Sequence, residues 1–242
     1  RRGMPLVLAA IIPRVTLQKI NDALELGEGE TASEIYDRAK ENAEPNLEMF
    51  IHVTKDGFGA IGHVDICYKG RIISFGNYDT NSERLFGAMG DGVLFSADRE
   101  KYIEFCKREN HKTLLGYGLA LSPEQLAAVD KEIAKLMSLT VPWDPPKTVK
   151  PKRPGIDKEE LMYAYKLKQE ADGRLYKFTS SKFKTYFVMS TNCVLLADTI
   201  VGAAGTDILS VRGFISPGTY QDYLDKEFER PHSLVVTKRV YQ

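Results

Sequence analysis

The period of the apolar pattern changes along the first third of the chain. Between residues 16 and 42, apolar side chains recur every three or four positions, and glycines near the middle divide the run. This spacing predicts two helices. Apolar and polar residues alternate over residues 47–54 and 61–68, which predicts strands. Lys69 and Gly70 then mark a turn, and residues 71–75 predict the return strand of an antiparallel meander.

Helices and single strands follow in the rest of the chain. Ser122, with proline next and Gln125 three positions on, has the pattern of a capping box that begins a helix. Residues 77–97 are rich in glycine and show no clear period, which predicts irregular structure. Further elements are predicted as helices at 98–109, 157–169, 192–203 and 217–228 and as strands at 112–121, 174–178, 182–189 and 233–241. This order is typical of an α+β domain with an antiparallel sheet packed against helices.

The chain is expected to divide into an N-terminal helical segment, residues 1–45, and one domain, residues 46–242. Within the domain, residues 142–154 hold five of the 11 prolines together with several basic residues. Because proline removes a backbone donor, such a segment is not a central helix or strand. Residues 142–154 are therefore predicted to be an exposed loop.

Composition limits the classes of function. Of the 242 residues, 43% are apolar and 27% are charged, as in ordinary globular proteins. The 33 lysines and arginines balance 33 acidic residues. Since general binding of nucleic acid needs an excess of cationic side chains, this balance argues against a nucleic-acid partner.

Three cysteines, Cys67, Cys106 and Cys193, show no spacing typical of a disulfide framework or a zinc site. We therefore expect no metal and no other cofactor. Cys67 and Cys106 are expected to be small core residues.

Cys193 has a different setting, because a predicted strand ends and a predicted helix opens just before it. Free backbone N–H groups and the positive end of the helix dipole at such a position favour the thiolate. The same amides can receive a developing oxyanion. Cys193 is thus the candidate nucleophile, and a thiol nucleophile needs a base within hydrogen-bond reach.

Histidine supplies the candidate base. His63 opens a predicted strand and is closely preceded by glycines, which would let a substrate or another backbone approach. His52 is expected to face solvent from its strand, and the other two are expected at the surface. The four histidines are His52, His63, His111 and His232.

The stretch Gly62-His63-Val-Asp-Ile-Cys-Tyr-Lys-Gly-Arg-Ile-Ile-Ser-Phe75 and the later Asn192-Cys193-Val-Leu-Leu-Ala resemble the circularly permuted branch of the NlpC/P60 papain-like cysteine hydrolases. That branch also contains the lecithin:retinol acyltransferase-like proteins. The resemblance implies a papain-like fold, with Cys193 as nucleophile and His63 as general base. It covers about residues 58–78 and 185–204 in detail, and elsewhere only the order of elements agrees.

The resemblance also implies a third polar residue, which orients the imidazole from the strand after the His63 strand. If Lys69-Gly70 is a two-residue turn, Ser74 and Tyr78 share the side of the sheet on which His63 lies. Asp79 and Asn77 have better chemistry for this role but need a bulge at the end of the strand. Ser74 and Asp79 are therefore the candidates for the third residue.

Hydrolysis of an amide bond, most often in cell-wall stem peptides, is the activity that the resemblance implies. The corresponding expectations are a peptide or cell-wall substrate, a secreted or periplasmic location in a bacterium, a role as an antibacterial toxin, and a matching inhibitor or immunity protein. An acyltransferase or acyl hydrolase acting on lipid is the alternative, and a binding module without catalysis is another. The apolar run of residues 5–12 is too short to span a bilayer but offers membrane contact.

Overall fold

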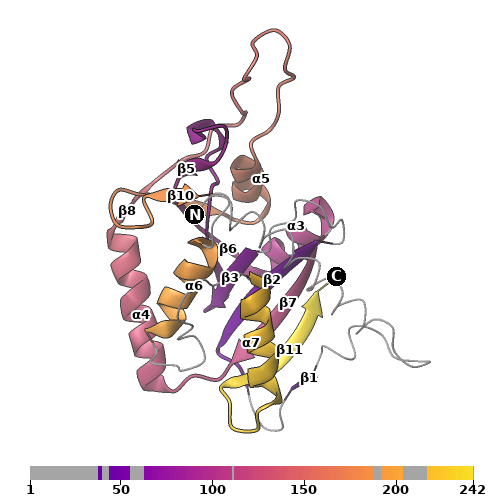
Figure 1. Cartoon of the computed structure of the whole chain (residues 1–242), viewed down its shortest axis with the longest axis vertical. Coiled ribbons are helices and arrows are strands. Elements are labelled where there is room, and N and C mark those ends of the chain that lie inside the picture. Colours follow the sequence, from indigo (N-terminus) through magenta and orange to yellow (C-terminus); the bar gives the residue numbers. More distant parts are fainter. Residues whose placement is uncertain are drawn as a thin grey trace, which may run out of the picture.

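An antiparallel sheet flanked by helices forms the centre of the computed structural model (Figure 1). The structure describes residues 38–39, 44–54, 63–110, 112–187, 192–203 and 217–241. Nine of the described strands form one sheet in the order β1-β11-β7-β2-β3-β4-β6-β9-β8, and β10 and β5 form a small second sheet. The α+β class and the antiparallel sheet packed against helices are confirmed.

The strands of the large sheet are β1 (Arg38–Ala39), β2 (Leu47–Thr54), β3 (His63–Tyr68), β4 (Arg71–Gly76), β6 (Val93–Asp98), β7 (Lys112–Leu119), β8 (Thr140–Pro142), β9 (Arg174–Phe178) and β11 (Val235–Tyr241). The small sheet contains β5 (Met89–Asp91) and β10 (Thr185–Phe187). The helices are α3 (Arg99–Asn110), α4 (Pro123–Ser138), α5 (Tyr163–Glu170), α6 (Asn192–Gly202) and α7 (Pro217–Glu229), with a short 3-10 helix η1 (Thr80–Ser82).

Local sequence signals explain where these elements begin and turn. Lys69 and Gly70 both have positive φ, 51° and 74°, which is the backbone of a two-residue hairpin turn between β3 and β4. The Ser122 side chain accepts from the Gln125 backbone while the Gln125 side chain accepts from the Ser122 backbone, so the predicted capping box begins α4.

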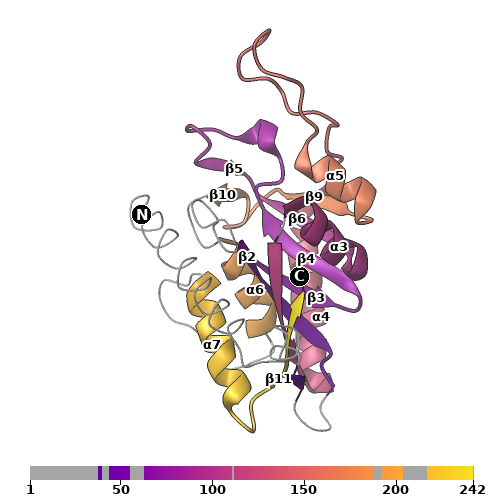
Figure 2. The same ribbon diagram turned by 90° about the vertical axis from the view of Figure 1, so that its right-hand side faces the viewer.

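Helices cover both faces of the sheet, and each face has its own apolar core. Figure 2 shows α6 and α7 on one side of the sheet and α3 and α5 on the other. Val64 and Ile66 of β3 pack toward α4, α6 and α7. Cys67 lies in the other core, with residues of α3 and α5. Successive residues of β3 are therefore buried on opposite sides.

Two expectations from the pattern are wrong. The stretch 77–97 is irregular only up to residue 88, because Met89–Asp91 forms β5 and Val93–Asp98 forms β6 between β4 and β9. β6 is buried against both cores, so its residues show no simple alternation. Within the segment expected to be helical, Arg38–Ala39 is a strand that pairs with the edge of β11. Nearly all of the remaining residues of 1–45 lie outside the described ones.

The proline-rich segment leaves the body of the protein as a long hairpin, at the top of Figure 1. Thr148 and Leu161 form a bridge at its base, and residues 150–156 are exposed as predicted. Trp143 and Pro145, nearer the sheet, are not exposed. Pro142 ends β8, the edge strand, where a missing N–H is tolerated.

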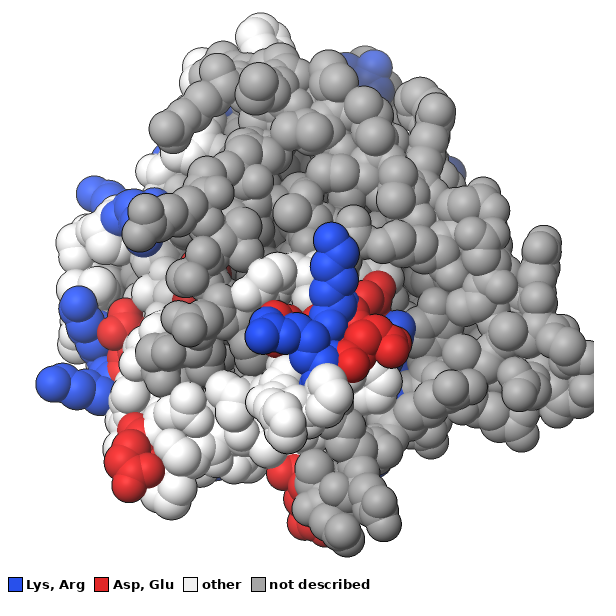
Figure 3. Space-filling view, turned by 60° about the horizontal axis from the view of Figure 1, so that its bottom comes forward, with Lys and Arg blue, Asp and Glu red and all other residues white. Residues whose placement is uncertain are grey.

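Charges of both signs lie together on the surface. In Figure 3, basic and acidic side chains of the described residues are in contact near the middle of the face that is drawn. Among the described helices, none is both long and apolar enough to cross a membrane.

Candidate active site

A buried carboxylate, Asp65, lies between two histidines on neighbouring strands. The antiparallel register of β2 and β3 places His52 directly opposite His63. Asp65 follows two residues after His63, so its side chain points to the same face of the sheet. His63 Nε2 lies 2.6 Å from Asp65 Oδ1, and His52 Nε2 contacts Oδ2. Tyr102 of α3 donates its hydroxyl to Oδ2 at 2.7 Å. Three side chains thus converge on one carboxylate.

Electrostatics keep this carboxylate ionised. The Asp65 side chain is 0% exposed, and burial alone raises the pKa of a carboxyl group. The charges of His63 and His52, together with hydrogen bonds from both rings, outweigh burial and hold the pKa of Asp65 well below its ordinary value. At neutral pH, Asp65 is therefore a fixed anion that accepts from its neighbours.

Ser74 and Tyr78 extend the network along β4 and beyond. Ser74 Oγ lies 2.7 Å from His63 Nε2, and the Tyr78 hydroxyl lies 2.7 Å from Ser74 Oγ. Burial, reinforced by the negative charge of Asp65, raises the pKa of Tyr78 well above its ordinary value, so this hydroxyl stays protonated. The expectation that Ser74 and Tyr78 share the side of His63 is confirmed, because the turn at Lys69-Gly70 sets the register as expected.

These contacts define the chemistry of the His63 ring. Its Nε2 faces both Asp65 and Ser74, which are an obligate acceptor and a hydroxyl. When the ring is neutral, a hydrogen on Nε2 satisfies this environment, and the lone pair is then on Nδ1. His63 is thus held in the tautomer whose Nδ1 can accept a proton. Its side chain is 18% exposed, so it is more accessible than the 3% exposed His52.

Cys193 is the second residue of α6, as expected, and its side chain lies outside the described residues. Four residues separate β10 from α6, and β10 pairs with β5 directly before β6. The first residue of β6, Val93, pairs with Gly76 at the end of β4. His63 begins β3 at that same end, opposite Gly76 by continuation of the β3–β4 register. The chain path therefore starts α6 at the end of the sheet where His63 lies.

The two candidates belong to opposite faces at that end. Leu196 and Ala197 of α6 pack into the core that contains Val64. His63 contacts the ring of His52, which in turn contacts Tyr102 of α3 on the other face. The helix that carries Cys193 and the ring of His63 therefore lie on opposite faces of the sheet.

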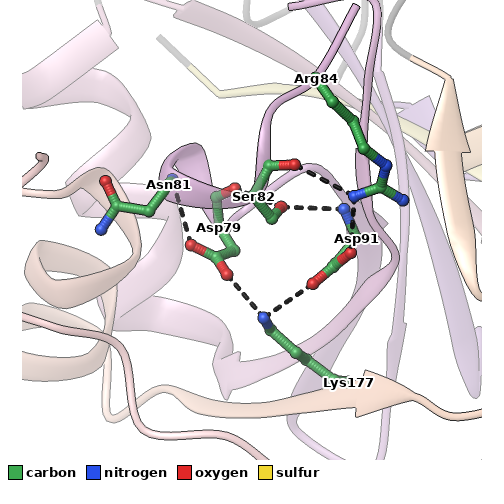
Figure 4. A network of polar contacts seen from close by, with 6 residues as sticks. All are labelled: Asp79, Asn81, Ser82, Arg84, Asp91 and Lys177. Atoms are coloured by element: carbon green, nitrogen blue, oxygen red, sulfur yellow. Dashed lines mark hydrogen bonds and ion pairs between the residues drawn. The ribbon is translucent and has the colours of Figure 1, made fainter. Parts of the chain in front are cut away.

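Asp79 takes part in a second network, away from this one along the chain (Figure 4). Its Oδ2 accepts from Lys177 Nζ at 2.6 Å, and its Oδ1 accepts from the Asn81 backbone at the start of η1. Lys177 also donates to Asp91 Oδ2 at 3.0 Å, and Arg84 donates to Asp91 Oδ1 at 2.9 Å. These contacts give Asp79 a structural role and make Asp65, not Asp79, the acid bound to His63.

The other histidines and cysteines differ in whether their burial agrees with expectation. The expectation that His52 faces solvent is wrong, because α3 covers that face of the sheet and His52 is 3% exposed. His232 is exposed as expected, and His111 lies outside the described residues. Cys67 and Cys106 are buried core residues as expected. Burial raises the pKa of the Cys67 thiol to about 12, so this thiol is inert at neutral pH.

Asp65 and His52 are the site residues that sequence reasoning missed. A signal for Asp65 was present, since a His-x-Asp spacing on a strand places both side chains on one face. For His52 the signal was weaker. Phe50 and Ile51 are adjacent apolar residues in its strand, which is typical of a sheet covered on both faces.

The same three residues are also suited to hold a metal ion. His52, His63 and Asp65 each offer one ligand atom, and these atoms all lie within 4.8 Å of one another. Two imidazoles and a carboxylate form a set that zinc accepts in catalytic sites.

The chain was compared with family models, with curated proteins and with solved structures, and none of the three comparisons gave a match.

Proposed function

We propose that the protein is a thiol hydrolase with Cys193 as nucleophile and His63 as general base. The substrate class we propose is an amide bond, in particular in bacterial cell-wall stem peptides, acted on outside the cytoplasm. A papain-like arrangement in circularly permuted order is part of this proposal. The observation that carries it is the contact of His63 Nε2 with the buried, ionised Asp65 at 2.6 Å.

The arrangement supports a defined sequence of proton transfers. His63 Nδ1 takes the thiol proton as Cys193 Sγ bonds to the carbonyl carbon, and the N-terminal amides of α6 stabilise the oxyanion. The protonated ring gives this proton to the leaving amine as the C–N bond breaks. Water then attacks the thioester, again with His63 as base, and the carboxylic acid and the thiol are released.

Asp65 and Ser74 act on this reaction through His63. Both contact Nε2, so they hold the ring and its tautomer while Nδ1 exchanges the proton. The carboxylate also stabilises the imidazolium that forms in each half-reaction. Because Asp65 is fully buried, its charge acts on the ring with little screening by water.

Hydrolysis of purified peptidoglycan by the full chain, followed by release of amines or peptide fragments, tests the proposal. Cys193→Ala and His63→Ala should each abolish release. Cys193→Ala should leave the midpoint of thermal unfolding within a few degrees, whereas His63→Ala should lower it, because it removes one partner of the buried Asp65. Cys106→Ala and His232→Ala are the matched controls, which should keep activity because one thiol is buried in the core and one ring is exposed. Full activity in Cys193→Ala would end the proposal. An inhibitor or immunity protein for a toxin of this kind would protect the substrate in the same assay.

A second candidate, transfer or hydrolysis of acyl groups on lipid, is favoured by one specific observation. Phe86 is fully exposed and Leu85 is 51% exposed at the tip of the loop before β5, and both have positive φ. Exposed apolar side chains gathered in one place mark a surface for contact with a protein or a membrane. Sedimentation with anionic vesicles should remove the wild-type protein from solution, and Phe86→Ser should weaken this binding. If neither protein binds the vesicles, a soluble substrate is favoured. Deletion of residues 1–12 tests the contribution of the N-terminal apolar run in the same assay.

A further inference from the structure

The ring nitrogens of His52 and His63 that face Asp65 are the same type of atom, Nε2, on opposing residues of adjacent strands. The ring centroids lie 5.0 Å apart with an angle of 74° between the planes. Both nitrogens therefore point at one carboxylate from two directions, and a paired β-scaffold holds their spacing.

We infer that His52, His63 and Asp65 form a binding site for a divalent first-row transition metal ion, with Zn²⁺ as the ion to test. The three ligand atoms all lie within 4.8 Å of one another. Zinc bonds to imidazole nitrogen and carboxylate oxygen at about 2.0–2.2 Å, so modest movements of the side chains bring all three atoms onto one ion.

The surroundings of the cluster match those of a metal site. Tyr102 donates to Asp65 Oδ2 at 2.7 Å, which is the kind of outer hydrogen bond that orients a ligating carboxylate. Asp65 is 0% exposed and His52 is 3% exposed, so an ion held there is shielded from water. His63, at the end of its strand and 18% exposed, is the member through which an ion enters.

Bound metal has a consequence for the thiol reaction, and this part of the inference rests on the proposed function. An ion on Nε2 occupies that lone pair, so the neutral His63 ring then carries its hydrogen on Nδ1. A ring in this state does not accept the proton of Cys193. Zinc should therefore act as an inhibitor that withdraws the general base, without contacting the nucleophile.

Titration of the full metal-free chain with Zn²⁺ in a calorimeter tests the site. The wild-type protein should bind one ion at this cluster, and His52→Gln should weaken binding by about 100-fold or more. His232→Gln is the matched control, because this exposed histidine lies outside the cluster and its loss should leave the affinity unchanged. Tyr102→Phe, which keeps the three ligands, should weaken binding by about tenfold. This variant carries the test if His52→Gln fails to fold by circular dichroism.

Two results would overturn the metal site: no zinc binding by the wild-type chain, or equal affinity in the wild-type, His52→Gln and Tyr102→Phe proteins. Cys193→Ala separates this inference from the proposed function, because it should bind zinc as the wild type does even though hydrolysis is lost. Zinc that binds at the cluster and leaves hydrolysis at full rate would overturn the inhibitory role.

Discussion

Two polar networks of this protein have central charges of opposite sign. In one, the anion Asp65 lies between the rings of His52 and His63, and in the other, the cation Lys177 lies between the carboxylates of Asp79 and Asp91. Asp65 is 0% exposed, whereas the Lys177 side chain is 25% exposed and that of Asp91 is 38% exposed. Water therefore reaches Lys177 and Asp91 but not Asp65.

We propose that this difference separates a reactive site from a network that only joins elements of the fold. The Lys177 network joins η1, β5 and β9, and Lys177 also lies 4.9 Å from the ring of Trp143. Burial lowers the pKa of Lys177, but hydrogen bonds from Lys177 to Asp79 and Asp91 outweigh it and raise the pKa. The cation is therefore permanent. The Asp65 network contains two imidazoles, the side chain that serves most often in general acid–base catalysis.

The largest effect on stability is expected from Asp65→Ala. The substitution removes the acceptor of the buried donors on His52 and Tyr102, and it leaves His63 with its contact to Ser74. Loss of one partner from a buried charged set costs about 3–5 kcal/mol in the free energy of unfolding. Urea denaturation measures this loss, which should be the same at low and high salt. A loss below about 1 kcal/mol would show that the hydrogen bonds to Asp65 are not formed in solution.

A smaller loss is expected from Lys177→Met, which keeps the volume of the side chain and leaves Asp79 and Asp91 facing each other. Because this network is partly exposed, we expect a loss of about 1 kcal/mol in the free energy of unfolding. The loss should change with salt, since about 1 M salt screens charges beyond about 3 Å. Urea denaturation at two salt concentrations gives the comparison with Asp65→Ala. An equal, salt-independent loss in both variants would remove the distinction between the networks.

Asp198 on α6 provides a third case, a partly buried carboxyl group that has no hydrogen-bonded cation among the described residues. Burial raises the pKa of Asp198 to about 6, and the charge of Lys182 offsets this only in part. Above pH 6 the group is ionised in the folded protein at a cost, and this cost falls away as the pH drops toward about 3.9, the pKa of the group in the unfolded chain. Asp198→Asn should therefore stabilise the protein by about 1 kcal/mol at pH 7 and by nothing at pH 3.5. Thermal unfolding at the two pH values checks the sign, and an equal gain at both would contradict it.

Short-range patterns of the sequence predict much of the fold. The alternation in β2 and β3, the turn at Lys69-Gly70 and the capping box at Ser122 are local signals, and the structure has each of them. β6 was missed because its burial in two cores removes the alternation by which an edge or half-exposed strand is recognised.

The candidate site was predictable only in part, because some of its contacts depend on how distant parts of the chain pair. Ser74 followed from the register of one hairpin, which a two-residue turn sets. The contact of His52 with Asp65 depends on the pairing of β2 with β3 and on α3 covering that face. Such pairing is a long-range property that the spacing within one strand does not encode. The alternation in β3 does place Asp65 beside His63, and this signal was available.

In the proposed reaction, Asp65 orients the His63 ring so that it can take the proton of Cys193. The most direct test of this role is the rate of iodoacetamide labelling of Cys193 as a function of pH, measured by mass spectrometry in the wild-type and Asp65→Asn proteins. We predict that wild-type Cys193 reacts ahead of Cys67 and Cys106 and reaches half-maximal rate well below pH 8.5, which is about the pKa of an ordinary thiol. In Asp65→Asn the half-maximal point should move toward pH 8.5. Identical profiles in the two proteins, or wild-type labelling of Cys193 only near pH 8.5, would contradict this role.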